Sequence, residues 1–340
     1  MRRGLARYNL GDLGGAIAEY RAALKVNPND AEAHNDLGVA LDKEGDPDAA
    51  IPEYRAALKI DPNYVEAHCN LGAAFFETGD PDGEISEYRA ALKGDPNYAD
   101  AHHKLGAALD DKGDVDGAIA EDRAALKLNP KDAGAHYNLG KALTQKGDLD
   151  GAITEDRAAL ELNPQEADAH NNIGVALAGK GDLDNAIAEF RAELKLNTNY
   201  TPALYNLGLA LYNKGDLDGA IIEFRSALQI NPTLPNASSD LGKALLSKGD
   251  LNAANAEYKV AQGSALFGGG DVAGAIDNYR TALILNPNSA DAHACLGLAL
   301  ERKGDLKGAL EEFRRTLELD PNFSAAKDGY DRVAKQLGKK

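Results

Sequence analysis

The chain has 340 residues with 54 acidic and 37 basic side chains, and its formal net charge at pH 7 is -17. Binding to duplex nucleic acid or to an anionic membrane surface requires a basic footprint, so this balance argues against both functions. No apolar run is long enough to span a bilayer. Two cysteines far apart in the sequence, and first residues without the apolar core of a signal peptide, lead us to expect a cytoplasmic location.

Gly-Asp pairs recur along the chain at a fixed spacing. They begin at residues 11, 45, 79, 113, 147, 181, 215 and 249, which are 34 residues apart, and then at 270 and 304. The interval from 249 to 270 is 21 residues, after which the period of 34 returns. A fixed period of this length predicts a repeat protein whose units stack on one another.

Residues 1–30 form a unit that lacks its first four positions, so we expect the chain to begin inside a helix, as a fragment of a longer protein would. Six complete units follow from residue 31 to residue 234. In the unit 133–166, Ala135, Leu139 and Leu143 lie on one stripe of a helix. Gly147 stands where that helix ends, and Asp148 stands where it can cap the next one. Each unit is therefore predicted to be a helical hairpin.

The short interval predicts an irregular junction at about 251–270. Its sequence begins like the second helix of one unit and ends like the first helix of the next, so we expect one helix from about Leu251 to Phe267 in place of two. Asn255 stands where other units have Ile, which suggests that the first of these roles is lost. The superhelix would then change direction here; a local kink in a continuous array is the alternative.

The expected organisation follows from these units. Residues 1–255 form one array with a partial repeat from 235, residues 256–323 form further repeats after the junction, and residues 324–340 form a capping helix.

The residues within each period resemble the tetratricopeptide repeat family. With Ala133 as position 1, the family's characteristic positions 7, 8, 11, 20, 27 and 32 are filled by Leu139, Gly140, Leu143, Ala152, Ala159 and Pro164. His136, at position 4, stands where the family often has Trp. The resemblance covers nearly the whole chain and implies an all-α, right-handed superhelical solenoid of helix-turn-helix repeats.

Six histidines occupy position 4: His34, His68, His102, His136, His170 and His293. Stacked hairpins place successive rings about 10 Å apart, too far to share a metal ion, so we expect these rings to pack in the place of Trp. Asp-x-Asp-Gly fragments after Gly113 and Gly147 resemble part of a calcium loop, but a helix follows at once and capping is the better explanation. No catalytic arrangement stands out, so we expect no enzyme, metal or cofactor.

Asparagine recurs at position 6, as Asn70, Asn138, Asn172 and Asn206. The family usually turns this position toward a concave groove. The column resembles the asparagine ladder in the tetratricopeptide arm of O-linked N-acetylglucosamine transferases, which holds an extended peptide by its backbone. A side-chain amide offers a donor and an acceptor, so it can match any peptide group. Solvated consensus residues without a role are the alternative.

Charged and aromatic residues complete the candidate groove: Lys104, Tyr137, Lys141, Tyr205 and Tyr212. Acidic residues outnumber basic ones at the family's groove positions, so we expect the groove to prefer a neutral or basic extended segment. A charge excess that serves solubility alone is the alternative.

Asp122 and Asp156 occupy position 24, where other units have rings such as Tyr54 and Phe190. The loss of two packing rings predicts either a hinge near residues 120–160 or a slightly looser, partnered interface.

Together these features predict a protein–protein interaction scaffold that binds an extended peptide. One alternative is a substrate-recruiting arm of a peptide-modifying, glycosyltransferase-like enzyme whose catalytic domain is absent from this chain. A self-assembly module that stacks through its open first unit is a third possibility.

Overall fold

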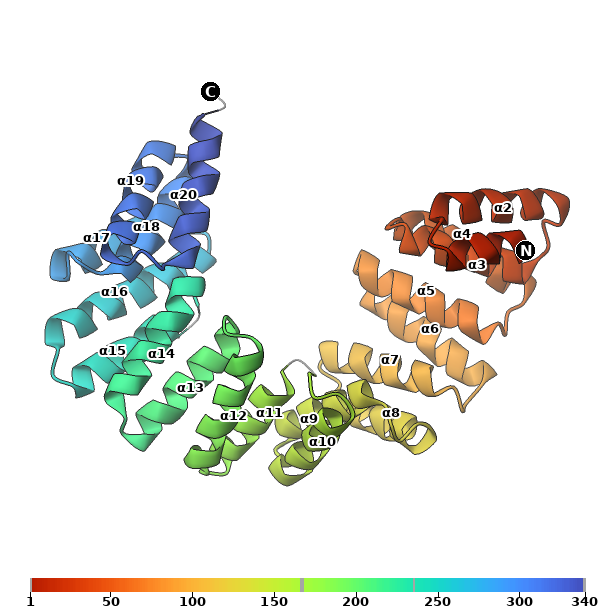
Figure 1. The fold of residues 1–340 in the computed structure, drawn as a ribbon, viewed down its shortest axis with the longest axis horizontal. Helices are drawn as coiled ribbons and strands as arrows, with labels where there is room; N and C mark the ends of the chain where they lie inside the picture. Colours follow the sequence, from red (N-terminus) through yellow and green to blue (C-terminus); the bar gives the residue numbers. More distant parts are fainter. Residues whose placement is uncertain (1, 166–167, 235, 339–340) are drawn as a thin grey trace. The chain divides into compact units, whose positions relative to one another are not determined.

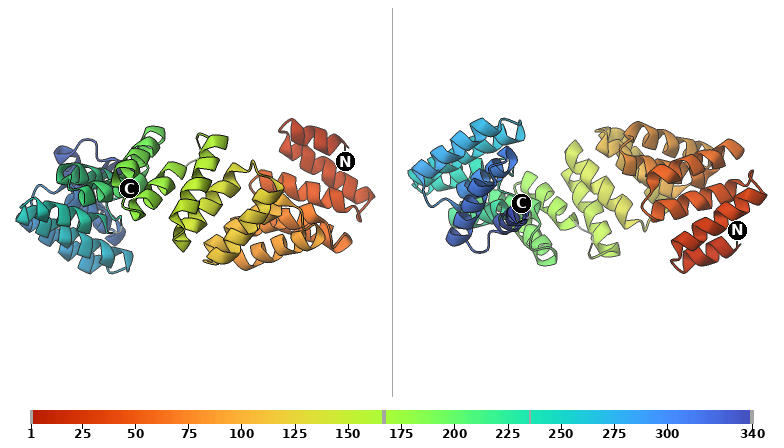
Figure 2. Two further views of the ribbon diagram at one scale, coloured as in Figure 1. Left: turned by 90° about the horizontal axis from the view of Figure 1, so that it is seen from below. Right: turned by 90° about the horizontal axis from the view of Figure 1, so that it is seen from above.

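The computed structural model describes residues 2–165, 168–234 and 236–338, and every regular element among them is an α-helix (Figure 2). The fold is the all-α repeat solenoid that the sequence predicts. It divides into two compact units, Met1–Glu166 and Ala167–Lys340. Residue 235, where a repeat is expected to begin, and residues 339–340 of the expected capping helix lie outside the described residues.

The helices of the first unit pair into five successive hairpins (Figure 1). They are α1 (Arg2–Asn9), α2 (Leu13–Val26), α3 (Ala31–Lys43), α4 (Pro47–Ile60), α5 (Val65–Thr78), α6 (Pro81–Gly94), α7 (Ala99–Asp111), α8 (Val115–Leu128), α9 (Ala133–Lys146) and α10 (Leu149–Leu162).

The second unit continues the hairpin pattern up to α15 and resumes it after α16. Its helices are α11 (Ala169–Gly179), α12 (Leu183–Leu196), α13 (Thr201–Lys214), α14 (Leu217–Ile230), α15 (Ala237–Ser247), α16 (Leu251–Gly268), α17 (Val272–Leu285), α18 (Ala290–Lys303), α19 (Leu306–Leu319) and α20 (Ser324–Leu337).

The turn inside each hairpin is built as the sequence predicts. Gly147 has a φ of 85°, a left-handed conformation that favours glycine. Asp148 then caps α10, because its Oδ1 accepts a hydrogen bond from the backbone N of Gly151 at 3.0 Å. Asp114 caps α8 through Gly117 in the same way. These two fragments are confirmed as helix caps.

Most hairpins are held where a glycine at position 8 meets a ring at position 24. A Cβ on Gly38 would lie only 2.5 Å from Cε1 of Tyr54, whose side chain is fully buried. The backbone of one helix therefore touches the ring of the other, and any side chain at this glycine would push the helices apart. The same contact occurs in Gly4–Tyr20, Gly72–Tyr88, Gly174–Phe190, Gly208–Phe224, Gly263–Tyr279 and Gly297–Phe313.

Two hairpins place a carboxyl group in this contact. Asp122 lies against Gly106 and Asp156 lies against Gly140, and both side chains are buried. The helices of the pairs α7–α8 and α9–α10 pack along each other as those of the other hairpins do. The carboxyl oxygens of Asp122 are buried and have no hydrogen-bond partner among the described residues, so the partnered interface does not hold for this side chain. Burial, followed by the nearby carboxylate of Asp110, raises the pKa of Asp122 to about 8.

α16 is a single helix, as expected, and it serves two hairpins. It packs against both α15 and α17. Tyr258 contacts Gly242 of α15 as a position-24 ring. Five residues further along α16, Gly263 contacts Tyr279 of α17. The suggestion from Asn255 that the first role is lost is wrong: Asn255 is exposed on the outer side of α16, so it does not take part in either contact.

The second unit turns back on itself after α16. α20 packs against α14 as well as against its neighbours α18 and α19 (Figure 1). Gln229 Nε2 donates to Asp320 Oδ2 at 2.5 Å, and Ser324 Oγ donates to the carbonyl of Gln229 at 3.1 Å. Helices this far apart in the sequence would lie several hairpins apart in a uniform stack, so the array changes direction at the junction.

Replacing Asp122 tests the position-24 contact. The folded chain binds a proton on Asp122 more tightly than the unfolded chain does, so stability falls as pH rises from about 4 to about 8. The loss is about 1.4 kcal/mol per pH unit. We expect Asp122→Asn to remove this contribution and make the pH dependence less steep, and Asp122→Tyr to do the same and add roughly 1.5–3 kcal/mol from ring burial. Urea unfolding at pH 6 and pH 8, followed by helical circular dichroism, measures both effects.

The exposed Asp331 on α20 provides the control, and Asp331→Asn should leave the pH dependence unchanged. A loss of stability with pH in Asp122→Asn as steep as that of the wild type would contradict a buried, proton-binding Asp122.

Candidate functional site

The position-6 asparagines lie on the first helices of the repeats, and two of them join neighbouring repeats. In the first unit, Asn70 on α5 donates from Nδ2 to Oδ1 of Asn35 on α3 at 2.9 Å. In the second unit, Asn206 on α13 makes the same bond to Asn171 on α11, also at 2.9 Å. Each bond links position 6 of one repeat to position 5 of the repeat before it. These amides are therefore structural links, a role that the sequence analysis missed.

The link leaves much of each amide available. A primary amide has two N–H groups and an oxygen with two lone pairs. The bond to the preceding repeat uses one N–H of Asn70 or Asn206 and fixes the direction of the side chain. One N–H and the carbonyl oxygen remain for another partner, on side chains that are only half-buried.

Asn138 and Asn172, the other two position-6 asparagines, have no asparagine at position 5 of the preceding repeat. Asn138 is half-buried on α9, and the preceding repeat has His103 instead of Asn at position 5. His103 contacts Asp132 through Nδ1 at 3.1 Å. Asn172 is half-buried on α11. The structure thus places Asn70 and Asn138 in the first unit and Asn172 and Asn206 in the second.

The charged candidates are held in ion pairs. Lys141 Nζ on α9 lies 2.8 Å from Asp110 Oδ2 on α7, and Gln145 Nε2 donates to the other oxygen of Asp110 at 2.8 Å. The hydrogen bond to Asp110 raises the pKa of Lys141. Lys104 pairs with Asp100 of its own helix at 3.2 Å. Part of the acidic surplus predicted for the groove is therefore neutralised by the protein itself.

The tyrosines lie on the same first helices. The hydroxyl of Tyr205 donates to Asp240 Oδ2 on α15 at 2.7 Å, and that of Tyr212 lies 3.4 Å from Ser247 Oγ. Tyr137 is half-buried on α9. The links of Tyr205, Tyr212 and the asparagines all span 35 residues, so a search for polar pairs at the period plus one would have found them.

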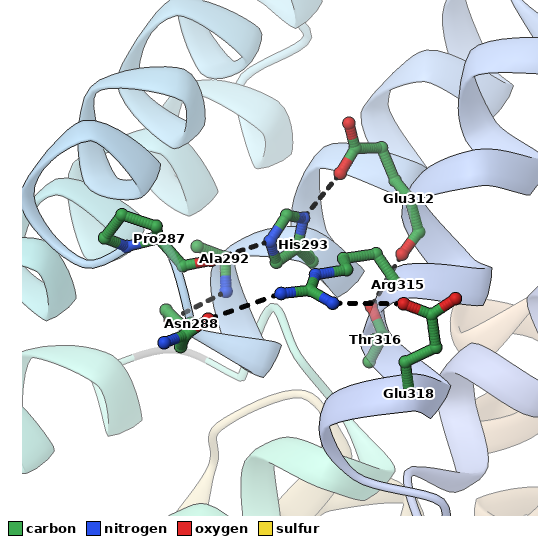
Figure 3. A network of polar contacts seen from close by, with 9 residues as sticks. Pro287, Asn288, Ala292, His293, Glu312, Arg315, Thr316 and Glu318 are labelled. Atoms are coloured by element: carbon green, nitrogen blue, oxygen red, sulfur yellow. Dashed lines mark hydrogen bonds and ion pairs between the residues drawn. The ribbon is translucent and has the colours of Figure 1, made fainter.

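The position-4 histidines are largely buried in the repeats, as expected, but they also form polar bridges, which the sequence analysis did not predict. His293 contacts Oε2 of Glu312 through Nδ1 at 2.6 Å and the carbonyl of Pro287 through Nε2 at 3.2 Å (Figure 3). Beside this bridge, Arg315 donates to Asn288 and Glu318. The bridges form because the imidazole has two polar atoms to satisfy where Trp has one.

The same bridge recurs in other repeats, in each case between position 4 and the glutamate at position 23. The pairs are His34–Glu53, His68–Glu87, His102–Glu121, His136–Glu155 and His170–Glu189. A carboxylate and a backbone carbonyl are both acceptors, so both ring nitrogens can donate only when the imidazole is protonated. The hydrogen bond to Glu87 raises the pKa of His68 above its usual value.

Comparison with known families agrees with this geometry. The sequence matches the description "Tetratricopeptide repeat" over residues 1–65, 42–102, 167–200 and 260–322. It matches "TPR repeat" over residues 109–146, 140–181 and 210–249. The chain belongs to the tetratricopeptide repeat family. Members of this family are typically non-catalytic scaffolds for protein–protein interaction.

Solved tetratricopeptide-repeat structures share the fold. YrrB, described as a TPR protein with an unusual peptide-binding site, is 24% identical with a TM-score of 0.50, over 54% of this chain and 95% of that one. PilF of Pseudomonas aeruginosa is 22% identical with a TM-score of 0.52, over 59% of this chain and 92% of that one. At these identities the likeness shows the fold alone. A search of curated proteins finds no match.

Within residues 2–165, 168–234 and 236–338, no group of three or more His, Cys, Asp or Glu side chains could hold a metal ion. None of the helices in these ranges is long and apolar enough to cross a membrane. Cys69 and Cys295 are buried free thiols.

Replacing Glu87 tests the histidine bridge. Because Glu87 raises the pKa of His68, the bridge stabilises the fold below the unfolded pKa of about 6.5, and this stabilisation is lost as pH rises through the folded value. We expect Glu87→Gln to lower the pKa of His68, as followed by an NMR pH titration of its imidazole protons. His103, which pairs with Asp132, serves as the internal control. An unchanged titration of His68 would show that the bridge does not set its protonation.

Proposed function

We propose that the chain is a protein–protein interaction scaffold that binds an extended peptide segment along the first helices of its repeats. The fixed amides of Asn70 and Asn206 are the observation that carries this proposal. Each is oriented by its bond to the preceding repeat and keeps one N–H and its oxygen for a ligand. A side chain that is already ordered loses less conformational entropy on binding, which favours affinity.

The spacing of the column suits an extended ligand. Neighbouring hairpins stack about 10 Å apart, and an extended peptide advances about 3.3 Å per residue. Within one unit, successive asparagines would therefore meet every third residue of the peptide. Contacts with the backbone at this interval would hold many sequences, while Tyr137, Tyr205, Tyr212 and the charged neighbours set the preference.

We further propose that the partner segment is neutral or basic. The first repeats support this preference, because carboxylates crowd the surface beside the column. Burial, followed by the neighbouring carboxylate of Glu32, raises the pKa of Asp36. Glu66 is exposed on the next first helix. A cationic residue of the ligand would relieve this crowding.

The proposal includes a cytoplasmic location and no catalytic activity of the chain itself. The buried free thiols Cys69 and Cys295 support the location, since a reducing compartment keeps such groups reduced. A substrate-recruiting arm of a peptide-modifying enzyme would use the same groove and the same amides. Self-association through the incomplete first repeat, residues 1–30, is the remaining alternative.

Peptide binding is tested by replacing the column. Peptides selected on the wild type from a display library of unstructured segments are measured by fluorescence polarisation. The first variant combines Asn70→Ala, Asn138→Ala, Asn172→Ala and Asn206→Ala. We expect it to lose at least tenfold in affinity, because each hydrogen bond contributes about 0.5–1.5 kcal/mol and 1.4 kcal/mol is tenfold.

A matched variant, Asn35→Ala with Asn171→Ala, removes the bonds between repeats and keeps every position-6 amide. We expect it to bind more weakly than the wild type, because the amides lose their orientation, but more tightly than the first variant, because the amides themselves remain. Both variants should keep their helical circular dichroism. Equal losses in the two variants would mean that repeat packing, and not contact with the ligand, explains the effect. No loss in either would exclude the column from binding.

A further inference from the structure

Glu257 is a position-23 glutamate that lacks its histidine. In six other repeats this glutamate pairs with the histidine at position 4, but the repeat of Glu257 has Ser238 at that position. Glu257 lies on the junction helix α16 and is only 3% exposed. Its Oε1 receives one long contact from Ser289 Oγ at 3.5 Å, and its Oε2 has no hydrogen-bond partner among the described residues. A buried carboxyl oxygen without a donor is costly.

This carboxyl group lines a cavity of about 250 Å³ that the turn at the junction creates. The walls come from α14, α16, the start of α18 and the connection that leads into α20, helices that the change of direction brings together. Its lining includes Arg225, Glu257, Asn288, Asp291, Asp320 and Phe323. Arg225 and Asn288 are exposed, so the cavity reaches solvent, whereas Glu257, Asp291 and Phe323 are buried.

Negative charge exceeds positive charge in this lining. Three carboxyl groups, from Glu257, Asp291 and Asp320, face one guanidinium, that of Arg225. Asp320 accepts from Gln229, whereas Oε2 of Glu257 has no donor among the described residues. Burial, followed by the charge of Asp291, raises the pKa of Glu257, and Arg225 opposes this effect. Burial likewise raises the pKa of Asp291 to about 6, again against Arg225.

We propose that this cavity binds a guanidinium or ammonium group, with Glu257 and Asp291 as its acceptors. In the other repeats the position-4 histidine donates to the position-23 carboxylate; here the ligand supplies a cationic N–H donor from the cavity, whose lining does not include Ser238. A guanidinium offers five N–H donors in one plane, which suits carboxylates that line a shared cavity. The volume equals that of about eight water molecules and accommodates the end of an arginine or lysine side chain.

The cavity lies away from the asparagine column and does not depend on peptide binding there. Glu257 is on α16 and Asp320 follows α19, whereas the position-6 asparagines of this unit are on α11 and α13. A protein partner could supply the cation from an arginine or lysine side chain, and a free diamine could supply the same chemistry.

The test uses small probes with the full chain. N-acetyl-arginine amide, its neutral isostere N-acetyl-citrulline amide, and putrescine are titrated at pH 7.5 by isothermal calorimetry and by thermal shift. We expect the arginine derivative to bind at least tenfold more tightly than the citrulline derivative. Tighter binding of putrescine than of the capped arginine would support the site and assign it to free amines. Equal binding of arginine and citrulline derivatives, or no binding of either cation, would overturn the proposal.

Variants locate the site. Glu257→Gln keeps the shape of the protonated side chain, so we expect an unchanged or higher Tm and at least a tenfold loss of arginine-amide affinity. Glu155→Gln is the matched control, because this position-23 glutamate already has its histidine; it should leave the affinity unchanged.

Arg225→Gln removes the competing cation from the exposed rim and should raise the affinity about threefold. Unchanged affinity in Glu257→Gln, or weaker binding in Arg225→Gln, would contradict the assignment.

Discussion

The contact between a position-8 glycine and a position-24 side chain determines how the whole chain is built. It brings the backbone of one helix onto the ring of the next, and it does so in nearly every hairpin. Phe313 shows how the contact propagates, because Gly297 of its own hairpin and Gly329 of α20 lie on the same fully buried ring. At α16 the same rule operates twice on one helix. The junction therefore keeps the packing of the repeat while it changes its direction, and that change forms the cavity beside Glu257.

A second set of contacts joins one repeat to the next on the first helices. Asn35–Asn70, Asn171–Asn206 and Tyr205–Asp240 all connect position 5 of one repeat with position 6 of the following one. The surface proposed for binding is thus also the surface that fixes the register between repeats. This double use explains why an amide is frequent there: it can satisfy a neighbour on one side and still offer a donor and an acceptor outward.

Much of the fold could be predicted from the sequence, and the reasons are local. Gly147 and Asp148 fix a helix end and a helix start by their own backbone and capping preferences, and the shortened interval predicts the single helix α16. The contacts of the candidate site could not be predicted in the same way, because they depend on how one helix is rotated against another. Asn70 looked solvated or ligand-binding in the sequence, yet it bonds to Asn35. The position-4 histidines looked like packing residues, although each repeat also carries their glutamate partner at a constant distance of 19 residues. Glu257 and Glu223 both lack that partner in the sequence, because their repeats carry Ser238 and Leu204 at position 4, so Glu257 is singled out only by its burial in the structure.

The most direct test of the account is an NMR experiment on the side-chain amides with a bound peptide. Protein labelled with ¹⁵N only in asparagine gives separate signals for the side-chain NH2 groups, which single substitutions assign. We expect a selected peptide to shift the signals of Asn70, Asn138, Asn172 and Asn206 and to slow the exchange of the free N–H groups of Asn70 and Asn206. Signals of Asn163 and Asn197, in the turns after α10 and α12, should stay in place. Shifts confined to those turns, with the position-6 signals unmoved by a bound peptide, would contradict the account.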